Sequence, residues 1–358
     1  MKADKRSGAV LRVVQWATGT VGTSALRAVI GHPQLELVGV RVYSENKEGK
    51  DAGDLCGLAA TGVLATRNVE ALLATLPDCV VYMADRTDAD EICRILESGA
   101  NIVTTRAEFF NPERMNAALR QRVEKACQTG NSSIHASGSS PGFITEALLP
   151  PLLSLQRRLD LLTIDEFAHC VDTCSEDMLI NIMRFGEAPE IFGATEFTER
   201  DTVFANSLGL IADAIGLAFD DVEVTSEHAV TRGPVKLHDT TIGSGTVGGQ
   251  RHTVTGLHKG KPVLRFRSNW FVTTDLEPAW QLRDDGWRVI VEGDTPLDIM
   301  IQFPVANDPD TRAKVMPNLT AHRPINAIPA VCSAAPGIVT TVDLPQIFAD
   351  LSRTDKRP

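Results

Sequence analysis

The chain has 358 residues, 43% of them hydrophobic and 23% charged, a balance typical of a globular protein large enough for two domains. Its formal net charge of −11 at pH 7 argues against nucleic-acid binding. No apolar run reaches the roughly 18 residues of a membrane span, and no signal-peptide core follows the basic N-terminal residues; we therefore expect a cytoplasmic protein that binds no membrane.

The first elements follow the order strand, glycine turn, helix. An apolar strand is predicted at 11–16, a turn at 19–22, and a helix through 25–30. On the G-x-G-x-x-G pattern of dinucleotide-binding folds, Ala17 stands at the first glycine position and glycines stand at the other two. This context predicts that a pyrophosphate binds the backbone of the turn. The residues concerned are Gly19, Thr20, Val21 and Gly22.

Strands and helices then alternate as far as residue 145, which predicts a parallel, Rossmann-like sheet with helices on both faces. We place this dinucleotide-binding domain at residues 1–150. Its further strands are predicted at 35–43, 79–84, 101–105 and 132–137, and its further helices at 69–76, 89–98 and 112–129.

Beyond Pro150, longer stretches with period-2 alternation predict an α+β second domain with a large, mostly antiparallel sheet. We place this substrate and dimerisation domain at 151–320, followed by a segment at 321–358 that returns to the first domain. The strands are expected at 161–167, 222–230, 251–257, 263–272, 287–292 and 297–303, with helices at 175–184, 206–219 and from 308 to 319. A literal G-x-G-x-x-G at 243–248 runs into a strand pattern, so we interpret it as a loop or hairpin turn.

The end of the second strand indicates which coenzyme binds. Folds that prefer NAD(H) place an acidic residue there, which binds the ribose 2′-hydroxyl. Here Arg41, Ser44 and Lys47 offer charge and hydrogen bonds to a 2′-phosphate. We therefore expect NADP(H) to be preferred, while Glu45 leaves NAD(H) possible.

In a parallel sheet the ligand lies beyond the carboxyl ends of the strands. Glu108 follows the fourth strand among apolar neighbours, where burial can adjust its proton affinity, and we single it out as the catalytic acid or base. Its alternative role is that of an ordinary carboxylate near a helix start. The other strand-end residues expected to contact the cofactor are Ala84, Thr104, Ser139, Pro141 and Gly142. Seven scattered cysteines without a C-x-x-C pair predict no metal site.

Four stretches together resemble NAD(P)-dependent amine dehydrogenases related to 2,4-diaminopentanoate dehydrogenase, whose first domain is like that of dihydrodipicolinate reductase. They are Val14–Gly22, Ser44–Gly53, Thr104–Glu108 and Arg323–Gly337. The resemblance implies that Glu108 is the catalytic glutamate, that Asn326 lies in a cofactor-binding motif, and that the protein is a homodimer. It also implies reversible reductive amination of a small ketone or aldehyde with ammonia. The His-His-x-x-Lys motif of dihydrodipicolinate reductase is missing from the corresponding region, residues 165–170, which argues against the lysine-pathway reaction.

Three other functions stay open at this point: an NADP(H)-dependent carbonyl reductase, an enzyme of the 2,4-diaminopentanoate dehydrogenase type, and an NADP(H)-binding sensor without turnover. Carbonyl reduction would need a proton donor, and a carboxylate donates poorly at neutral pH unless its pKa is raised. Candidate residues for the substrate pocket are Phe143, Phe167 and His169.

Overall fold

The computed structural model describes residues 10–171, 174–192, 199–283, 285–305 and 308–352. The basic N-terminal segment considered above lies outside these ranges. The chain divides into two compact units. Unit 1 comprises Met1–Phe143 and Pro317–Pro358, and unit 2 comprises Ile144–Met316.

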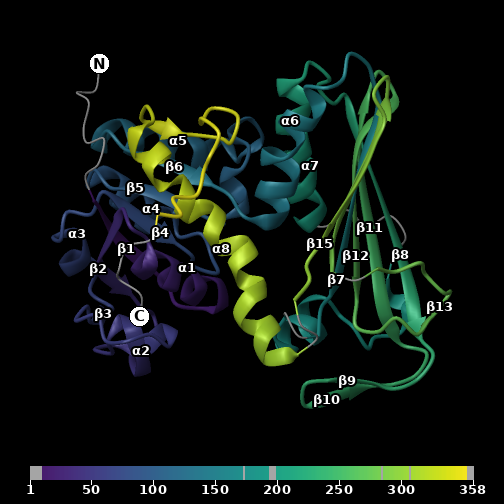
Figure 1. Cartoon of the computed structure of the whole chain (residues 1–358), viewed down its shortest axis with the longest axis horizontal. Coiled ribbons are helices and arrows are strands. Elements are labelled where there is room, and N and C mark those ends of the chain that lie inside the picture. Colours follow the sequence, from purple (N-terminus) through teal and green to yellow (C-terminus); the bar gives the residue numbers. More distant parts are fainter. Residues whose placement is uncertain (1–9, 172–173, 193–198, 284, 306–307, 353–358) are drawn as a thin grey trace. The chain divides into compact units, whose positions relative to one another are not determined.

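Unit 1 is built on a parallel seven-stranded sheet with the order β16-β6-β5-β4-β1-β2-β3 (Figure 1). Short, fully buried strands such as β4 and β5 form because apolar side chains cover both faces of the sheet. The strands are β1 (Leu11–Trp16), β2 (Leu35–Arg41), β3 (Ala65–Thr66), β4 (Cys79–Tyr82), β5 (Asn101–Thr104), β6 (Ser133–Ala136) and β16 (Gly337–Ile338).

Helices cover both faces of this sheet. On one face, α1 and α8 pack against strand residues such as Val13, Val81 and Val103. On the other face, α4 and α5 pack against Val80 and Ile102. The predicted Rossmann-like fold of the first part of the chain is thereby confirmed. The helices are α1 (Thr20–Gly31), α2 (Ala52–Cys56), α3 (Val69–Leu73), α4 (Ala89–Glu97), α5 (Ala117–Gly130) and α8 (Pro309–Ser333).

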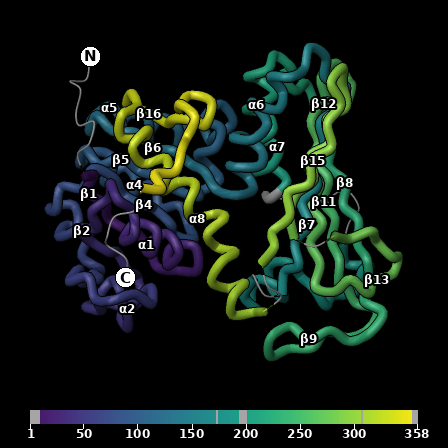
Figure 2. The backbone as a smooth tube through the Cα atoms, in the orientation of Figure 1, coloured from purple at the N-terminus to yellow at the C-terminus, as the bar shows by residue number. Residues whose placement is uncertain are grey.

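Helix α8 is longer than the sequence pattern predicts. We expected a helix that ends at residue 319 and a proline-punctuated tail, whereas α8 continues to Ser333 with Pro317, Pro324 and Pro329 inside it. Each interior proline removes one helical hydrogen bond. Ala321, Ile325, Ile328 and Val331 nevertheless recur at helical spacing and are buried against α1 and the sheet, which offsets that cost. After α8 the chain forms β16 beside β6 (Figure 2).

Unit 2 contains a second seven-stranded sheet with the order β13-β8-β11-β12-β7-β14-β15, in which only the pair β12–β7 is parallel. The prediction of a mostly antiparallel sheet is therefore confirmed. The strands are β7 (Leu159–His169), β8 (Asp221–Thr231), β11 (Val247–His258), β12 (Lys261–Phe271), β13 (Leu276–Glu277), β14 (Gly286–Gly293) and β15 (Leu297–Gln302). A separate hairpin joins β9 (Val235–Leu237) to β10 (Thr240–Ile242).

Alternation along β12 separates the two faces of this sheet. Phe266 stacks on Phe204 of α7 with a centroid distance of 4.0 Å, whereas the adjacent Arg267 forms an ion pair with Asp165 at 2.6 Å. Among the described residues, unit 2 contains the helices α6 (Leu149–Leu153) and α7 (Glu199–Ala214), short helical turns at Met178–Ile182 and Pro189–Ile191, and the first turns of α8 as far as Met316. The helix expected at 206–219 therefore begins and ends earlier than predicted.

The G-x-G-x-x-G match at 243–248 lies mainly in the turn that joins β10 to β11, as the sequence predicts. Within the described ranges, no helix is long and apolar enough to cross a membrane. In the same ranges, no three His, Cys, Asp or Glu side chains gather in a way that could hold a metal ion.

Candidate functional site

The turn after β1 has the geometry that a dinucleotide-binding loop needs. Ala17 adopts a left-handed backbone with φ of 71° at the first glycine position, and Gln15 Nε2 donates to its carbonyl oxygen at 2.9 Å. A Cβ at Gly22 would lie 2.4 Å from that same oxygen, so the close approach of α1 to the turn requires glycine. A Cβ at Gly19 would meet no atom within 4 Å, which leaves open space beside the turn.

The N-terminus of α1 is free to bind an anion. Its N-cap, Gly19, offers no side-chain acceptor, and the first turn contains no acidic residue. The N–H groups of this turn and the helix dipole therefore favour a negative charge. Lys47 adds a positive charge, since its Nζ donates to the carbonyl oxygen of Thr18 at 2.8 Å and to its hydroxyl at 3.2 Å. This arrangement fits a pyrophosphate.

The end of β2 brings two of the three expected 2′-phosphate ligands into local contacts. The Arg41 guanidinium lies 4.6 Å from the centroid of the Tyr43 ring, and its Nη1 donates to the carbonyl oxygen of Val42. Ser44 Oγ donates to Asn46 Oδ1 at 2.5 Å and is exposed. These residues lie where the adenosine ribose binds in such folds.

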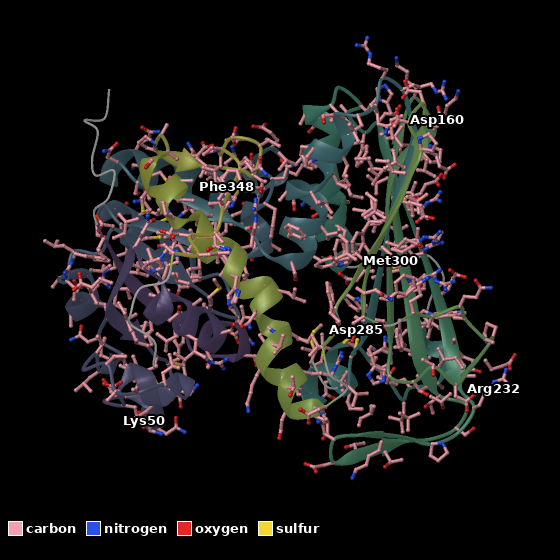
Figure 3. All side chains as sticks on the ribbon, in the orientation of Figure 1. Lys50, Asp160, Arg232, Asp285, Met300 and Phe348 are labelled. Carbon is pink, nitrogen blue, oxygen red and sulfur yellow. The ribbon has the colours of Figure 1, made fainter. Side chains whose placement is uncertain are left out.

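Glu45, the residue that kept NAD(H) possible, forms an ion pair with Arg67 at 2.9 Å. Its side chain is 85% exposed. Lys50, a few residues further along the same loop, is exposed immediately before α2 (Figure 3).

Glu108 lies in a 3-10 turn, Ala107–Phe109, which follows β5 at the carboxyl edge of the sheet. Its Oε1 accepts a hydrogen bond from Thr87 Oγ1 at 2.7 Å and another from Arg106 Nη2 at 3.2 Å. Arg106 is itself held, because its Nε donates to Thr87 Oγ1 at 2.9 Å and its Nη1 donates to the carbonyl oxygen of Asp85 at 2.6 Å. The hydrogen bonds to Oε1 therefore fix the Glu108 side chain.

The environment of Glu108 favours the carboxylate form. Burial by itself raises the pKa of Glu108, but the hydrogen bond from Thr87, its own backbone N–H and the nearby Arg106 together lower the pKa below its usual value. The second oxygen, Oε2, is buried and has no hydrogen-bond partner in the part of the chain that the structure describes. The group therefore presents a buried anionic oxygen that can accept a hydrogen bond or a proton.

Neither Thr87 nor Arg106 was predicted as a site residue. Thr87 follows β4 and Arg106 follows β5, and these strands pair in parallel, so their ends meet at one edge. Only the order of strands in the sheet brings them together, and the sequence contains no local signal for it.

Two of the other expected cofactor residues, Ala84 and Thr104, lie at the same edge of the sheet. Ala84 is buried beyond β4, and Thr104 is fully buried with its hydroxyl donating to the carbonyl oxygen of Tyr82 at 2.7 Å. The Thr104 hydroxyl therefore already donates a hydrogen bond within the sheet. Asn326 is half-buried on α8.

The turn after β6 contains Ser139, Pro141 and Gly142. Ser139 Oγ lies 2.8 Å from Thr320 Oγ1 of α8, which ties the turn to that helix. Gly142 has φ of 124°, a backbone conformation that side chains rarely adopt. The turn is thus held against α8 at the carboxyl edge of β6.

The three expected substrate-pocket residues divide between the units. Phe143 ends the first segment of unit 1, whereas Phe167 and His169 belong to β7 of unit 2. His169 lies edge-on to Phe271 with a centroid distance of 5.5 Å, and its backbone N–H donates to Asp285 Oδ1 at 2.6 Å. A pocket that contains all three side chains stays a prediction.

Comparisons with known proteins agree with this architecture. The model of the dihydrodipicolinate reductase N-terminus matches residues 13–125, and that of the 2,4-diaminopentanoate dehydrogenase C-terminal domain matches residues 199–357. An amine dehydrogenase of Streptomyces virginiae is 30% identical over 94% of this chain and 96% of its own length.

Two solved structures share the fold. An amine dehydrogenase of Mycobacterium smegmatis superimposes with a TM-score of 0.76 at 20% identity, covering 96% of this chain and 98% of its own. The UDP-N-acetylglucosamine 3-dehydrogenase of Acidithiobacillus ferrooxidans gives a TM-score of 0.51 at 13% identity, covering 93% and 92% of the two chains. The expected resemblance is confirmed, and the chain belongs to the amine dehydrogenase family of NAD(P)-dependent oxidoreductases.

Proposed function

We propose that this protein is an NADP(H)-dependent amine dehydrogenase that interconverts a small ketone or aldehyde plus ammonia with a primary amine. The observation that carries the proposal is Glu108. Its pKa is lowered by hydrogen bonds from Thr87 and Arg106 that outweigh the effect of burial, and its buried Oε2 has no partner within the described residues. An ionised carboxylate of this kind can accept a hydrogen bond from an N–H group and can stabilise a developing cation. It is a poor proton donor.

The coenzyme is supported by the fit of the glycine turn to a dinucleotide. The N–H groups at the start of α1 would hold the pyrophosphate, with Lys47 beside them. Arg41 and Ser44 would meet the ribose end, and a preference for NADP(H) with NAD(H) still accepted is our proposal from their chemistry. The other proposed coenzyme-binding residues are the strand-end residues Ala84, Thr104, Ser139, Pro141 and Gly142 and, on α8, Asn326.

The nicotinamide group supplies or accepts a hydride when bound. In the direction of amination, Glu108 Oε2 accepts a hydrogen bond from ammonia and takes up a proton as the nitrogen adds to the carbonyl carbon. Glu108 passes that proton to the carbinolamine oxygen, which leaves as water after taking a second proton from solvent, and the carboxylate, ionised again, stabilises the substrate iminium cation. Thr87 and Arg106 hold Oε1 throughout, so that Oε2 keeps its orientation.

Carbonyl reduction without ammonia is the second candidate reaction, and the electrostatics of the site count against it. A reductase needs a group that gives a proton to the alkoxide, and the lowered pKa leaves Glu108 without a proton at neutral pH. Both tyrosines of the chain, Tyr43 and Tyr82, lie in the coenzyme half, where Tyr82 is buried.

We further propose a cytoplasmic homodimer formed through the large sheet of unit 2. Phe143, Phe167 and His169 are the proposed substrate-pocket residues. The proposed physiological substrate is a small carbonyl compound or amine.

The test is oxidation of NADPH with cyclohexanone, with and without ammonium, repeated with NADH. We expect turnover that requires ammonium and is faster at subsaturating NADPH than at the same concentration of NADH. Equal turnover without ammonium would favour the carbonyl reductase. Coenzyme binding without turnover across a panel of ketones and amines would favour the sensor.

A further inference from the structure

Arg41, proposed above for the ribose end of the coenzyme, belongs to a cluster with three side chains that have no role so far: Trp16, Tyr43 and Glu91. Trp16 and Arg41 are register partners in adjacent parallel strands, so their side chains leave the same face of the sheet. Tyr43 lies two residues beyond Arg41. Glu91 reaches them from the first turn of α4, the helix that covers this face.

Glu91 is the centre of this cluster. Its Oε2 accepts hydrogen bonds from Trp16 Nε1 and from the Tyr43 hydroxyl, both at 2.9 Å, and its Oε1 lies 3.9 Å from Arg41 Nε. Burial and then the hydrogen bond to Glu91 raise the pKa of Tyr43 to about 12, so the phenol keeps its proton and donates it. The position of Glu91 within α4 is thus tied to both strand ends.

The Arg41 guanidinium is held from three sides. It lies 4.6 Å from the Tyr43 ring centroid and 5.9 Å from the Trp16 ring centroid, in addition to its contact with Glu91. The side chains of Arg41 and Glu91 are each only 12% exposed. Solvent therefore screens their charges less than it screens an exposed pair. Tyr43 leaves 47% of its surface exposed beside them.

This placement matters because the end of β2 is where the adenosine ribose of a coenzyme lies in the fold. A 2′-phosphate there is attracted by Arg41 and repelled by Glu91, whereas a 2′-hydroxyl carries no charge and responds weakly to either. We propose that Glu91 is a specificity-determining residue, which positions Arg41 and offsets its charge so that the enzyme accepts both NADPH and NADH. The inference rests on the proposed coenzyme function.

The experiment compares dissociation constants of NADPH and NADH for the full-length wild type and Glu91→Gln, measured by coenzyme fluorescence. Glutamine keeps the size of the side chain and an oxygen that can accept from Trp16 and Tyr43, but it removes the charge. We expect NADPH to bind about threefold to tenfold more tightly in the variant and NADH to change by less than about twofold.

Asp90→Asn is the matched control. It removes one negative charge from the same turn of α4, but Asp90 is 90% exposed and is paired with Arg122. We expect its NADPH-to-NADH affinity ratio to stay within about twofold of the wild type. An equal shift in both variants would assign the effect to net charge and would overturn the role of Glu91.

A measurement on the wild type keeps the inference testable if Glu91→Gln folds poorly, and a double variant tests the route through Arg41. The wild type should prefer NADPH over NADH by about tenfold or less. A preference of about a thousandfold would contradict the claim that Glu91 offsets the charge of Arg41. In an Arg41→Gln background, Glu91→Gln should no longer change the ratio, and a persisting shift would overturn the route through Arg41. Failure of the wild type to bind either coenzyme would instead contradict the proposed function.

Discussion

Replacing Gly22 by alanine tests how the glycine turn holds α1 against β1. The new Cβ would lie 2.4 Å from the Ala17 carbonyl oxygen, whereas ordinary contacts begin at 3.4 Å, so the helix start or the turn must move by about 1 Å. Ala17 cannot yield freely, because its φ is already 71° and its carbonyl oxygen accepts from Gln15. We expect a loss of about 1–3 kcal/mol in the free energy of unfolding.

The matched variant is Gly19→Ala. Its Cβ would meet nothing within 4 Å and its φ is −73°, so we expect stability within about 0.5 kcal/mol of the wild type. The added methyl group instead occupies the open space where the pyrophosphate would approach, and coenzyme affinity should fall. Urea unfolding and coenzyme titration of both variants give the two quantities. The reasoning fails if Gly22→Ala is as stable as the wild type, or if Gly19→Ala binds coenzyme with unchanged affinity.

Three other expectations follow from contacts in unit 1. Lys47→Ala should weaken NADPH and NADH to a similar extent, by about fivefold or more in titrations, because Nζ lies beside the proposed pyrophosphate site at Thr18; a loss confined to NADPH would instead place its charge at the 2′-phosphate. Thr87→Val removes a donor to Glu108, so the pKa of Glu108 should rise and the acid limb of the kcat/KM pH profile should move to higher pH, and an unmoved limb would contradict the hydrogen-bond argument. Burial lowers the pKa of His135 to about 4. Since the unfolded chain binds this proton more readily, the free energy of unfolding should fall by up to about 3 kcal/mol as the pH drops from about 6.5 towards 4. Urea unfolding of His135→Asn should lack this part of the pH dependence.

The sequence predicts the elements whose signals are local. The strand Leu11–Trp16, its glycine turn and α1 follow one another without a break, and both burial and turn geometry agree with the pattern. The six longer strands of unit 2, of 6 to 12 residues, were found because apolar and polar residues alternate over parts of them, most clearly in β8. The continuation of α8 was missed because its prolines carry a strong breaking signal, which tertiary burial of Ile325 and Ile328 outweighs.

The candidate site shows the same division between local and non-local signals. Glu108 was found from its place at a strand end. The hydrogen bonds that orient it come from Thr87 and Arg106, residues at the ends of two strands that only the sheet brings together. The contact of Arg41 with Glu91 is of the same kind, since the two residues are 50 positions apart and no local sequence pattern indicates that they meet.

The central claim is that Glu108 takes up and returns a proton and stabilises positive charge on nitrogen. Glu108→Gln tests it most directly. The measurement pairs the steady-state rate of NADPH oxidation with cyclohexanone and ammonium with a titration of NADPH binding. The account predicts a loss of at least about a hundredfold in turnover, the usual scale for a general base, with NADPH affinity within about twofold of the wild type. Unchanged turnover in a variant that still binds NADPH would contradict it.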